Sequence, residues 1–329
     1  FRIFVLLLSL SLLLFMFSLL FSGIKISSFQ LLNFKISQFY MKLDKKLILN
    51  IENIEYKSEK TMTNSSIEDI KKNLDILPFV LKWFQSIDIE KLSINDNIVK
   101  IVLNKDILSV ENKFFLLDSK IDVLSKEVLL DINNLYLKDY NILFKGKAKI
   151  DYFDEELKYF GDIYYQDLIV SGNIDITKDR VNFFIKSEFF KNLHFLKKYL
   201  DLPEVANSWM YDNVTGDFKL NWFYGEFDLN KNEIIEKSLQ GDAVIENAKI
   251  RFENSLEEIN TSKVNVNFKN STLHFDLVDA IYKEKELKNS FVTIKDIANE
   301  NSGLVLVNIE AKTSLDRDIL GILEAYGIV

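Results

Sequence analysis

Apolar and polar residues alternate over most of this 329-residue sequence, and this pattern limits the fold more than any other feature. Between residues 263 and 280, Val264, Val266 and Phe268 alternate with polar residues, and the alternation resumes at Leu273 after a polar turn. Successive side chains of a β-strand point to opposite faces, so this stretch predicts a hairpin with one apolar and one polar face. Similar short segments follow one another through short polar turns, which predicts an antiparallel meander.

Two stretches with helical spacing interrupt the predicted strands. The first lies near residues 65–85 and begins with Ser65 and Glu68 in the spacing of a capping box, and the second covers roughly residues 189–210. We expect these insertions to cover the edge or the end of the apolar face. A further helical pattern starts at Asp316, close to the last residue, so we expect the chain to be part of a longer protein. Because single strands and helices do not alternate, a parallel doubly wound sheet is not expected.

The first 23 residues are predicted to anchor the chain in a membrane. Residues 3–21 carry no charge, and about 20 apolar helical residues span the hydrocarbon core of a bilayer. The competing interpretation is a cleaved signal peptide, which has a shorter apolar core and a small-residue cleavage site. Because this run is long and no such site follows, we expect an uncleaved helix. Arg2 favours a cytoplasmic N-terminus, which would place residues 24–329 outside the cytoplasm as one β domain.

Composition and motifs narrow the classes of function. The net charge of −8 and the lack of a sustained basic block argue against nucleic acid as a partner. The chain has no Cys, which excludes disulfides and thiolate metal sites. Of the two histidines, His194 lies among Phe and Leu and His274 lies on the polar side of a strand. Since nucleotide-binding and metalloprotease motifs are also missing, we expect no enzyme, no metal and no cofactor.

The apolar faces of the predicted strands must be covered by something. The hydrophobic fraction is 48% and includes 27 Phe, and large exposed apolar surfaces promote aggregation. Two sheets can pack as a sandwich, one sheet can close into a barrel, or a curled sheet can leave an apolar trough that acyl chains fill. Periodicity alone does not choose among these three.

The residues predicted on the apolar face are those that alternate with polar residues in the strand patterns. In a trough they would contact acyl chains, whereas in a sandwich they would form an ordinary core. They are Val99, Ile101, Leu103, Leu108, Val110, Phe115, Leu117, Val181, Phe183, Ile185, Phe218, Leu220, Trp222, Val264, Val266, Phe268, Leu273, Phe275, Leu277, Leu304 and Leu306.

The order of these segments resembles the AsmA-like superfamily. An apolar N-terminal run is followed by ISSFQLLNFKISQFYMKLDKKLILNIENIEY and then by strands broken by LPFVLKWF. The later part, from SWMYDNVTGDFKLNWFYGEFDL through the strands to residue 297, is similar to the YhdP branch, in which short strands follow a helix that ends near a Trp, here Trp209. The resemblance covers most of the chain and is carried by architecture, because the family has no catalytic signature.

The resemblance implies a bridge-like lipid-transfer protein of Gram-negative bacteria. Its fold would be mainly β, an elongated, curled antiparallel sheet with an open groove, an N-terminal transmembrane helix and two short helical interruptions. Such a protein would be anchored in the inner membrane, lie mostly in the periplasm and move phospholipid towards the outer membrane, with membrane lipids and other envelope proteins as partners. The alternative is an envelope scaffold with closed β-sandwich domains, or an outer-membrane protein assembly factor by analogy with the TamB branch.

Overall fold

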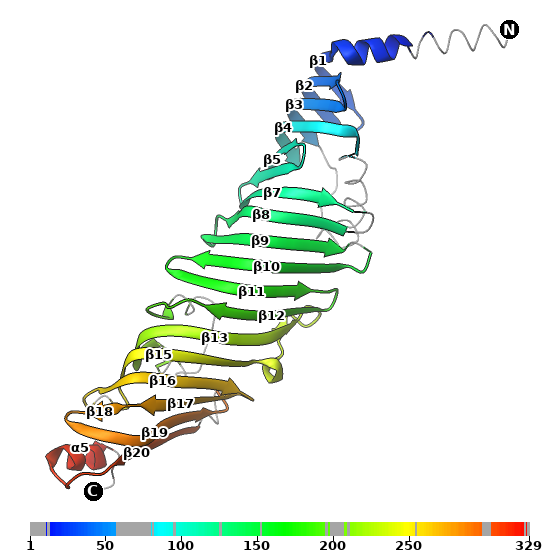
Figure 1. The fold of residues 1–329 in the computed structure, drawn as a ribbon. Coiled ribbons are helices and arrows are strands. Elements are labelled where there is room, and N and C mark those ends of the chain that lie inside the picture. The colour runs from blue at the N-terminus through cyan, green and yellow to red at the C-terminus, as the bar shows by residue number, and fades with distance from the viewer. Residues whose placement is uncertain are drawn as a thin grey trace. The chain divides into compact units, whose positions relative to one another are not determined.

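The computed structural model of the chain is mainly β-structure and divides into two compact units, residues 1–165 and residues 166–329 (Figure 1). The β domain predicted for residues 24–329 is therefore divided between the two units. The structure describes residues 11, 14–56, 80, 82–94, 97–124, 127–151, 153–194, 197, 207–208, 211–253, 255–297, 304–325 and 327.

Unit 1 contains one sheet in which nearly all neighbours in the chain are also neighbours in the sheet. Short polar turns join most of these strands, and this favours antiparallel pairing as the alternation predicts. The strands are β1 (Ile24–Leu31), β2 (Phe34–Leu43), β3 (Leu47–Tyr56), β4 (Phe84–Ile94), β5 (Asn97–Asn104), β6 (Ile107–Asn112), β7 (Phe115–Val123), β8 (Glu127–Leu137), β9 (Ile142–Asp151) and β10 (Glu156–Tyr165).

The predicted meander is wrong at one junction of unit 1. Strands β3 and β4 pair parallel, with Ile51 opposite Ile89. Two parallel neighbouring strands need a connection that runs from the end of the first strand back to the level of its start, and this requires a long segment. Most of the helix predicted near residues 65–85 falls on residues 57–79, which lie outside the described residues. Residues 80, 82 and 83 are helical, and β4 begins directly after them.

Unit 2 contains a second series of antiparallel strands and a C-terminal helix (Figure 1). Its elements are β11 (Leu168–Ile176), β12 (Arg180–Ser187), β13 (Val214–Asp228), β14 (Glu233–Ile234), the 3-10 helix η2 (Glu236–Ser238), β15 (Gln240–Ile250), β16 (Ile259–Lys269), β17 (Thr272–Val278), β18 (Ala280–Tyr282), β19 (Lys285–Lys295), β20 (Leu304–Ala311) and α5 (Arg317–Ala325). Helix α5 confirms the helical pattern at the end of the sequence.

The helical insertion predicted for residues 189–210 is described only in part. Phe190 does not belong to a helix, because it forms an isolated bridge with Phe218 of β13. His194 and Lys197 have 3-10 geometry, and Ser208 is α-helical. Residues 195–196, 198–206 and 209–210 lie outside the described residues.

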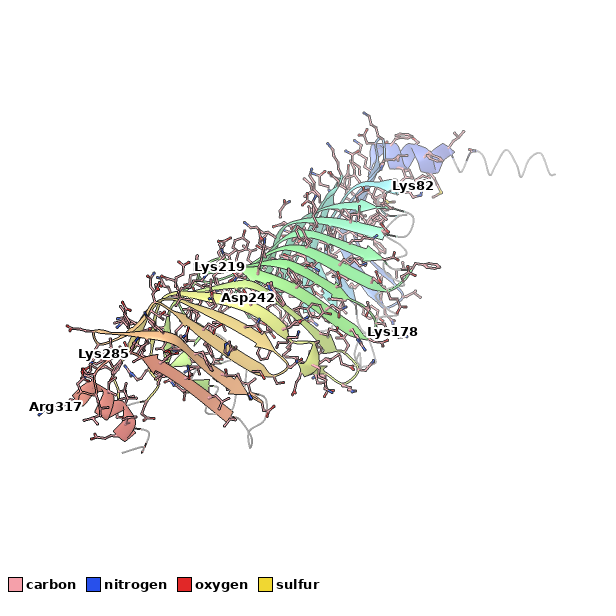
Figure 2. All side chains as sticks on the ribbon, turned by 60° about the horizontal axis from the view of Figure 1, so that its bottom comes forward. Lys82, Lys178, Lys219, Asp242, Lys285 and Arg317 are labelled. Atoms are coloured by element: carbon pink, nitrogen blue, oxygen red, sulfur yellow. The ribbon has the colours of Figure 1, made fainter. Side chains whose placement is uncertain are left out.

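The buried core of each unit lies on one side of its sheet. In unit 2 the core cluster runs from Val214 of β13 to Ile294 of β19, and Val264 and Val292 within it have 0% exposure. In unit 1 a smaller cluster is centred on Leu103. Side chains stand on both sides of the ribbon in Figure 2, so each sheet also presents a second face to solvent.

The helix that precedes β1 is described over residues 14–22. Leu14, Phe15, Met16 and Phe21 are exposed there. Within the described part of the chain, no helix is both long enough and apolar enough to cross a bilayer. Residues 1–10 and 12–13 lie outside the described residues, and the transmembrane helix predicted for residues 1–23 stays a prediction.

Candidate functional site

Cross-strand partners define two faces in unit 2. Residues directly opposite each other in antiparallel strands place their side chains on the same side of the sheet. One apolar ladder of such partners crosses the sheet from β13 to β20. It consists of Leu220, Ala243, Val266, Phe275, Val292 and Val307. We call the side that carries this ladder the apolar face of unit 2, and the opposite side the polar face.

The polar face carries a corresponding ladder of mostly hydrophilic partners, next to the apolar one. Asp242, Asn267, His274 and Thr293 are opposite one another in β15, β16, β17 and β19. Asp242 is also bonded on this side by the amide of Asn221, with Nδ2 and Oδ1 2.6 Å apart. Alternation along each strand therefore separates the two chemistries cleanly over most of unit 2.

Unit 1 has an apolar face of the same kind. Its central ladder crosses β5 to β10 and consists of Ile101, Val110, Leu117, Leu135, Phe144 and Ile163. All residues predicted on the apolar face in unit 1, and all but three of those in unit 2, lie on that face, since they are members of these ladders or occupy every second position from a member. The three exceptions are Trp222, Leu304 and Leu306.

Trp222 lies on the polar face because of a β-bulge. The register of β13 against β15 shifts between Leu220 and Trp222, where Leu220 is opposite Ala243 and Trp222 is opposite Asp242. One extra residue in a strand inverts the side-chain alternation beyond it. Trp222 consequently stacks on Phe184 across the polar face, with ring centroids 6.4 Å apart and an interplanar angle of 5°.

In β20 the predicted phase is wrong along the whole strand. Leu306 is opposite Thr293, whereas Val307 is opposite the fully buried Val292. Leu304 and Leu306 are 51% and 40% exposed, and Val305 and Val307 pack against the core cluster of unit 2 instead. The strand begins with four consecutive apolar residues, so alternation is ambiguous at its start.

Exposure varies along the apolar face of unit 2. The strands from β15 to β19 form a closed part, in which Val264 and Val292 are inaccessible and Phe275 is also buried. Val181 and Ile185 of β12 are only partly buried. The apolar face is thus covered by the chain itself at its C-terminal part and remains partly accessible near β12.

A few described residues at the ends of the two predicted helical insertions contact these faces, whereas the prediction that the insertions cover the apolar face falls mostly on residues outside the described ones and stays a prediction. Leu193 and Phe190 pack against the core cluster of unit 2, and Val80 packs against the cluster around Leu103 in unit 1. Ile322 of α5 also packs against the cluster of unit 2. Described residues outside the strands therefore cover part of each apolar face.

An aromatic row crosses the partly accessible part of the apolar face in unit 2. Phe223 of β13 lies between Phe183 of β12 and Phe268 of β16, with ring centroids 6.0 Å and 6.3 Å apart and interplanar angles of 29°. All three side chains are partly buried. Phe223 was not among the residues predicted on the apolar face, because the bulge places it there instead of Trp222.

A tyrosine and a pair of glycines interrupt the apolar face of unit 1. Gly146 and Gly161 are opposite each other in β9 and β10. A Cβ at Gly161 would lie 2.1 Å from the carbonyl oxygen of Lys145 and 2.7 Å from the hydroxyl of Tyr159, so the two strands leave no room for a side chain there. The Tyr159 hydroxyl lies 2.9 Å from the Lys145 carbonyl oxygen, and burial raises the pKa of Tyr159 to about 12.

The two histidines have structural surroundings. His274 Nδ1 lies 2.7 Å from Thr293 Oγ1, and Nε2 lies 3.0 Å from Asp276 Oδ1. This order resembles a triad, but Thr293 is buried within the sheet, and a nucleophile must reach its substrate. His194 packs near Tyr211, with ring centroids 6.0 Å apart. The described residues contain no group of His, Cys, Asp and Glu able to hold a metal ion.

Comparison with known proteins agrees with this geometry in the second unit. No match to the chain was found among curated proteins or among solved structures. The family model described as YhdP protein matches residues 191–328, which comprise most of unit 2. Over these residues the chain matches the YhdP family, and the resemblance to an AsmA-like protein of the YhdP type is confirmed.

Proposed function

We propose that the chain shields the acyl chains of phospholipids on its apolar face and conducts these lipids between the inner and outer membranes of a Gram-negative envelope. The match to the YhdP family over residues 191–328 and the long series of antiparallel strands in each unit support a lipid-transport role. Conduction needs no covalent step, so the protein is proposed to work without an enzyme site, a metal or a cofactor.

The observation that carries the proposal is the accessible part of the apolar face. Phe183, Phe223 and Phe268 form a row of aromatic rings on one face of a sheet and are only partly buried. Transferring an acyl chain of about 16 carbons out of water is favourable by on the order of 12 kcal/mol. Apolar side chains that the protein leaves partly uncovered offer such a chain a surface without hydrogen-bonding groups to desolvate.

We further propose that residues 1–23 anchor the chain in the inner membrane and that the strands lie in the periplasm. The described part of this segment is helical and exposes Leu14, Phe15 and Phe21. Exposed apolar side chains on a helix favour an apolar environment. Cell fractionation with a reporter fused after residue 23 tests this placement, and recovery of the reporter on the cytoplasmic side would overturn it.

The conduit is tested by placing a photoreactive amino acid at adjacent aromatic positions that point to opposite faces. Phe183 and Phe223 lie on the apolar face, whereas Phe184 and Trp222 are their neighbours on the polar face. After illumination in living cells, phospholipid adducts are expected at Phe183 and Phe223 and not at the two controls. Equal capture at all four positions, or capture at none, would refute the assignment of the apolar face as the lipid surface.

A second candidate function is a non-enzymatic envelope scaffold or assembly factor. The closed part of unit 2 favours it, because Val264 and Val292 are covered by the chain and are inaccessible to a lipid in this conformation. A scaffold would use its core only for stability and would bind protein through its polar face. Protein adducts at Phe184 and Trp222 without lipid adducts at Phe183 and Phe223 would make the scaffold the better conclusion.

A further inference from the structure

Helix α5 is docked on unit 2 more shallowly than any strand of the closed part. Ile322 packs against the core cluster, but none of the nine residues of α5 is buried. A Cβ added at Gly321 would have no neighbour within 4 Å, so the helix meets open space at this position. By contrast, Val264 and Val292 in the sheet beneath are inaccessible. The apolar contact of α5 is therefore small.

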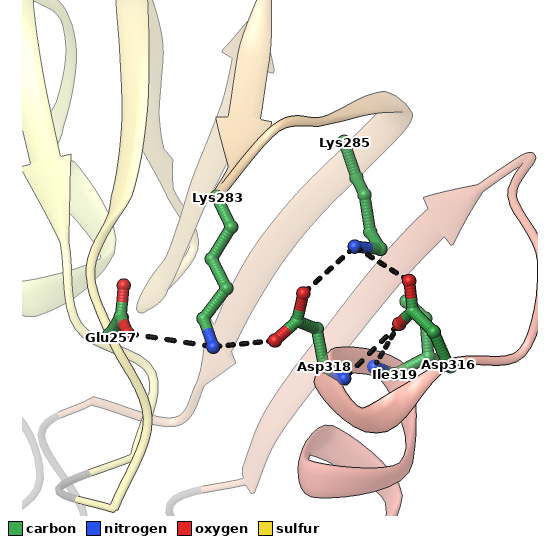
Figure 3. Close-up of polar contacts among 6 residues, drawn as sticks. All are labelled: Glu257, Lys283, Lys285, Asp316, Asp318 and Ile319. Atoms are coloured by element: carbon green, nitrogen blue, oxygen red, sulfur yellow. Dashed lines mark hydrogen bonds and ion pairs between the residues drawn. The ribbon is translucent and has the colours of Figure 1, made fainter.

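An ionic network, which we call the latch, holds the first turn of α5 to the turn between β18 and β19 (Figure 3). Lys285 Nζ lies 3.0 Å from both Asp316 Oδ2 and Asp318 Oδ2. Lys283 Nζ lies 2.6 Å from Asp318 Oδ1 and 3.5 Å from Glu257 Oε1. Lys283 of the turn and Lys285 at the start of β19 thus bind two aspartates at the helix start, and Lys283 also reaches Glu257 in the loop before β16.

Asp316 has a second role in the latch, because it caps α5. Its Oδ1 accepts hydrogen bonds from the backbone N–H groups of Asp318 and Ile319, at 3.1 Å and 3.2 Å. An aspartate that caps a helix satisfies N–H groups that have no partner within the helix. The cap couples the helix to the latch, since the same carboxylate holds the first turn and binds Lys285.

From these contacts we propose that α5 is a lid on the C-terminal part of the apolar face, which opens as a unit by breaking the latch while the sheet stays folded. Solvent reaches the carboxylates of the latch, since the side chains of Asp318 and Asp316 are 32% and 42% exposed, whereas Lys285 is 13% exposed. Ion pairs that solvent reaches contribute little stability and are screened by salt, and elements with few buried contacts open before the core does. If the apolar face binds lipid as proposed above, opening of the lid would admit acyl chains to the part of the face that α5 covers; this part of the inference rests on the proposed function.

The lid can be tested without lipid, because the chain contains no Cys and a single introduced thiol reports one position. The full chain in detergent micelles would carry either Ile322→Cys, which reports α5, or Val264→Cys, which reports the sheet. Asp316→Asn and Asp318→Asn are then added together to remove both charges of the latch. Asn also caps helices well, so the first substitution keeps the cap. Glu233→Gln, at an exposed ion pair in β14, is the matched control.

The rate of maleimide labelling distinguishes a lid from a fixed part of the core. The two Asn substitutions, or added salt, are expected to accelerate labelling at Ile322→Cys roughly three- to tenfold. The labelling rate at Val264→Cys is expected to stay the same. Glu233→Gln is expected to change the labelling rate at neither thiol. Unchanged labelling at Ile322→Cys would overturn the proposal, and so would equal acceleration at both thiols, which would mean that α5 and the sheet open together. Neither result depends on lipid capture at Phe183 and Phe223, so failure of the lid and failure of the conduit are distinguishable.

Discussion

The phase of β20 leads to a prediction in which two neighbouring residues should lose very different amounts of stability on the same substitution. Val307→Asn would place an amide opposite Val292, which is inaccessible to solvent, within the core cluster of unit 2. The change removes about 1.6 kcal/mol of apolar burial, and a buried amide without a partner costs about 1–3 kcal/mol more. Leu306→Asn would place the same amide on the polar face opposite Thr293, where water solvates it.

We therefore expect Val307→Asn to lower the free energy of unfolding by about 3–4 kcal/mol and Leu306→Asn by about 1 kcal/mol. Urea unfolding of the purified full chain, followed by far-UV circular dichroism and tryptophan fluorescence, measures both. Leu306→Ala and Val307→Ala serve as controls for the loss of side-chain volume alone. If Leu306→Asn were as destabilising as Val307→Asn, the assignment of the two faces in β20 would be refuted.

Further predictions concern unit 1 and the latch. Gly161→Ala should destabilise unit 1 by about 2–3 kcal/mol in urea unfolding, because its Cβ would lie 2.1 Å from the carbonyl oxygen of Lys145. Burial raises the pKa of Tyr159 from 10.0 to about 12, so its contribution to stability is complete below pH 10 and is lost as the pH rises through 12; Tyr159→Phe should remove that part of the alkaline transition. Hydrogen bonds from the latch lysines lower the pKa values of Asp316 and Asp318 below their ordinary value of 3.8. Docking of α5 should therefore be constant from about pH 5 to pH 9 and weaken as the pH falls below the ordinary value. Lower protection factors of the α5 amides at pH 7 than at pH 5, after correction for the intrinsic rise of amide exchange with pH, would contradict this.

Sequence alternation predicted the faces of the sheet well where polar residues mark one side of a strand. In β16, Val264, Val266 and Phe268 alternate with Asn and Lys, and the structure places them together on the apolar face. In β20 the first four residues are all apolar, but Asn308 and Glu310 follow with the parity of Leu304 and Leu306. Those two polar residues mark the polar face, so the sequence contained the signal for the correct phase.

Two other features could not be predicted from periodicity. The bulge at Leu220 and Trp222 depends on the pairing of β13 with β15, and Trp222 and Phe223 are equally suited to the interior of a sheet. The parallel pairing of β3 and β4 depends on the path of the segment between them. Helical spacing in the sequence predicts that a segment forms a helix, but it does not predict the path by which that segment connects two strands. Both features are set by contacts between strands, whereas alternation describes each strand by itself.

The parallel junction has a consequence for the order in which the sheet can assemble during synthesis. The antiparallel neighbours in unit 1 pair across short turns, so each new strand can join the sheet soon after it emerges. Strand β4 cannot join β3 before the whole segment between Tyr56 and Phe84 has emerged, and closing this longer loop has a larger entropic cost. Strands β1 to β3 and the strands from β4 onward would then form as two independent nuclei. Pairing of β3 with β4 would join them, and a change in the connecting segment could slow this step of unit 1 assembly without altering either nucleus.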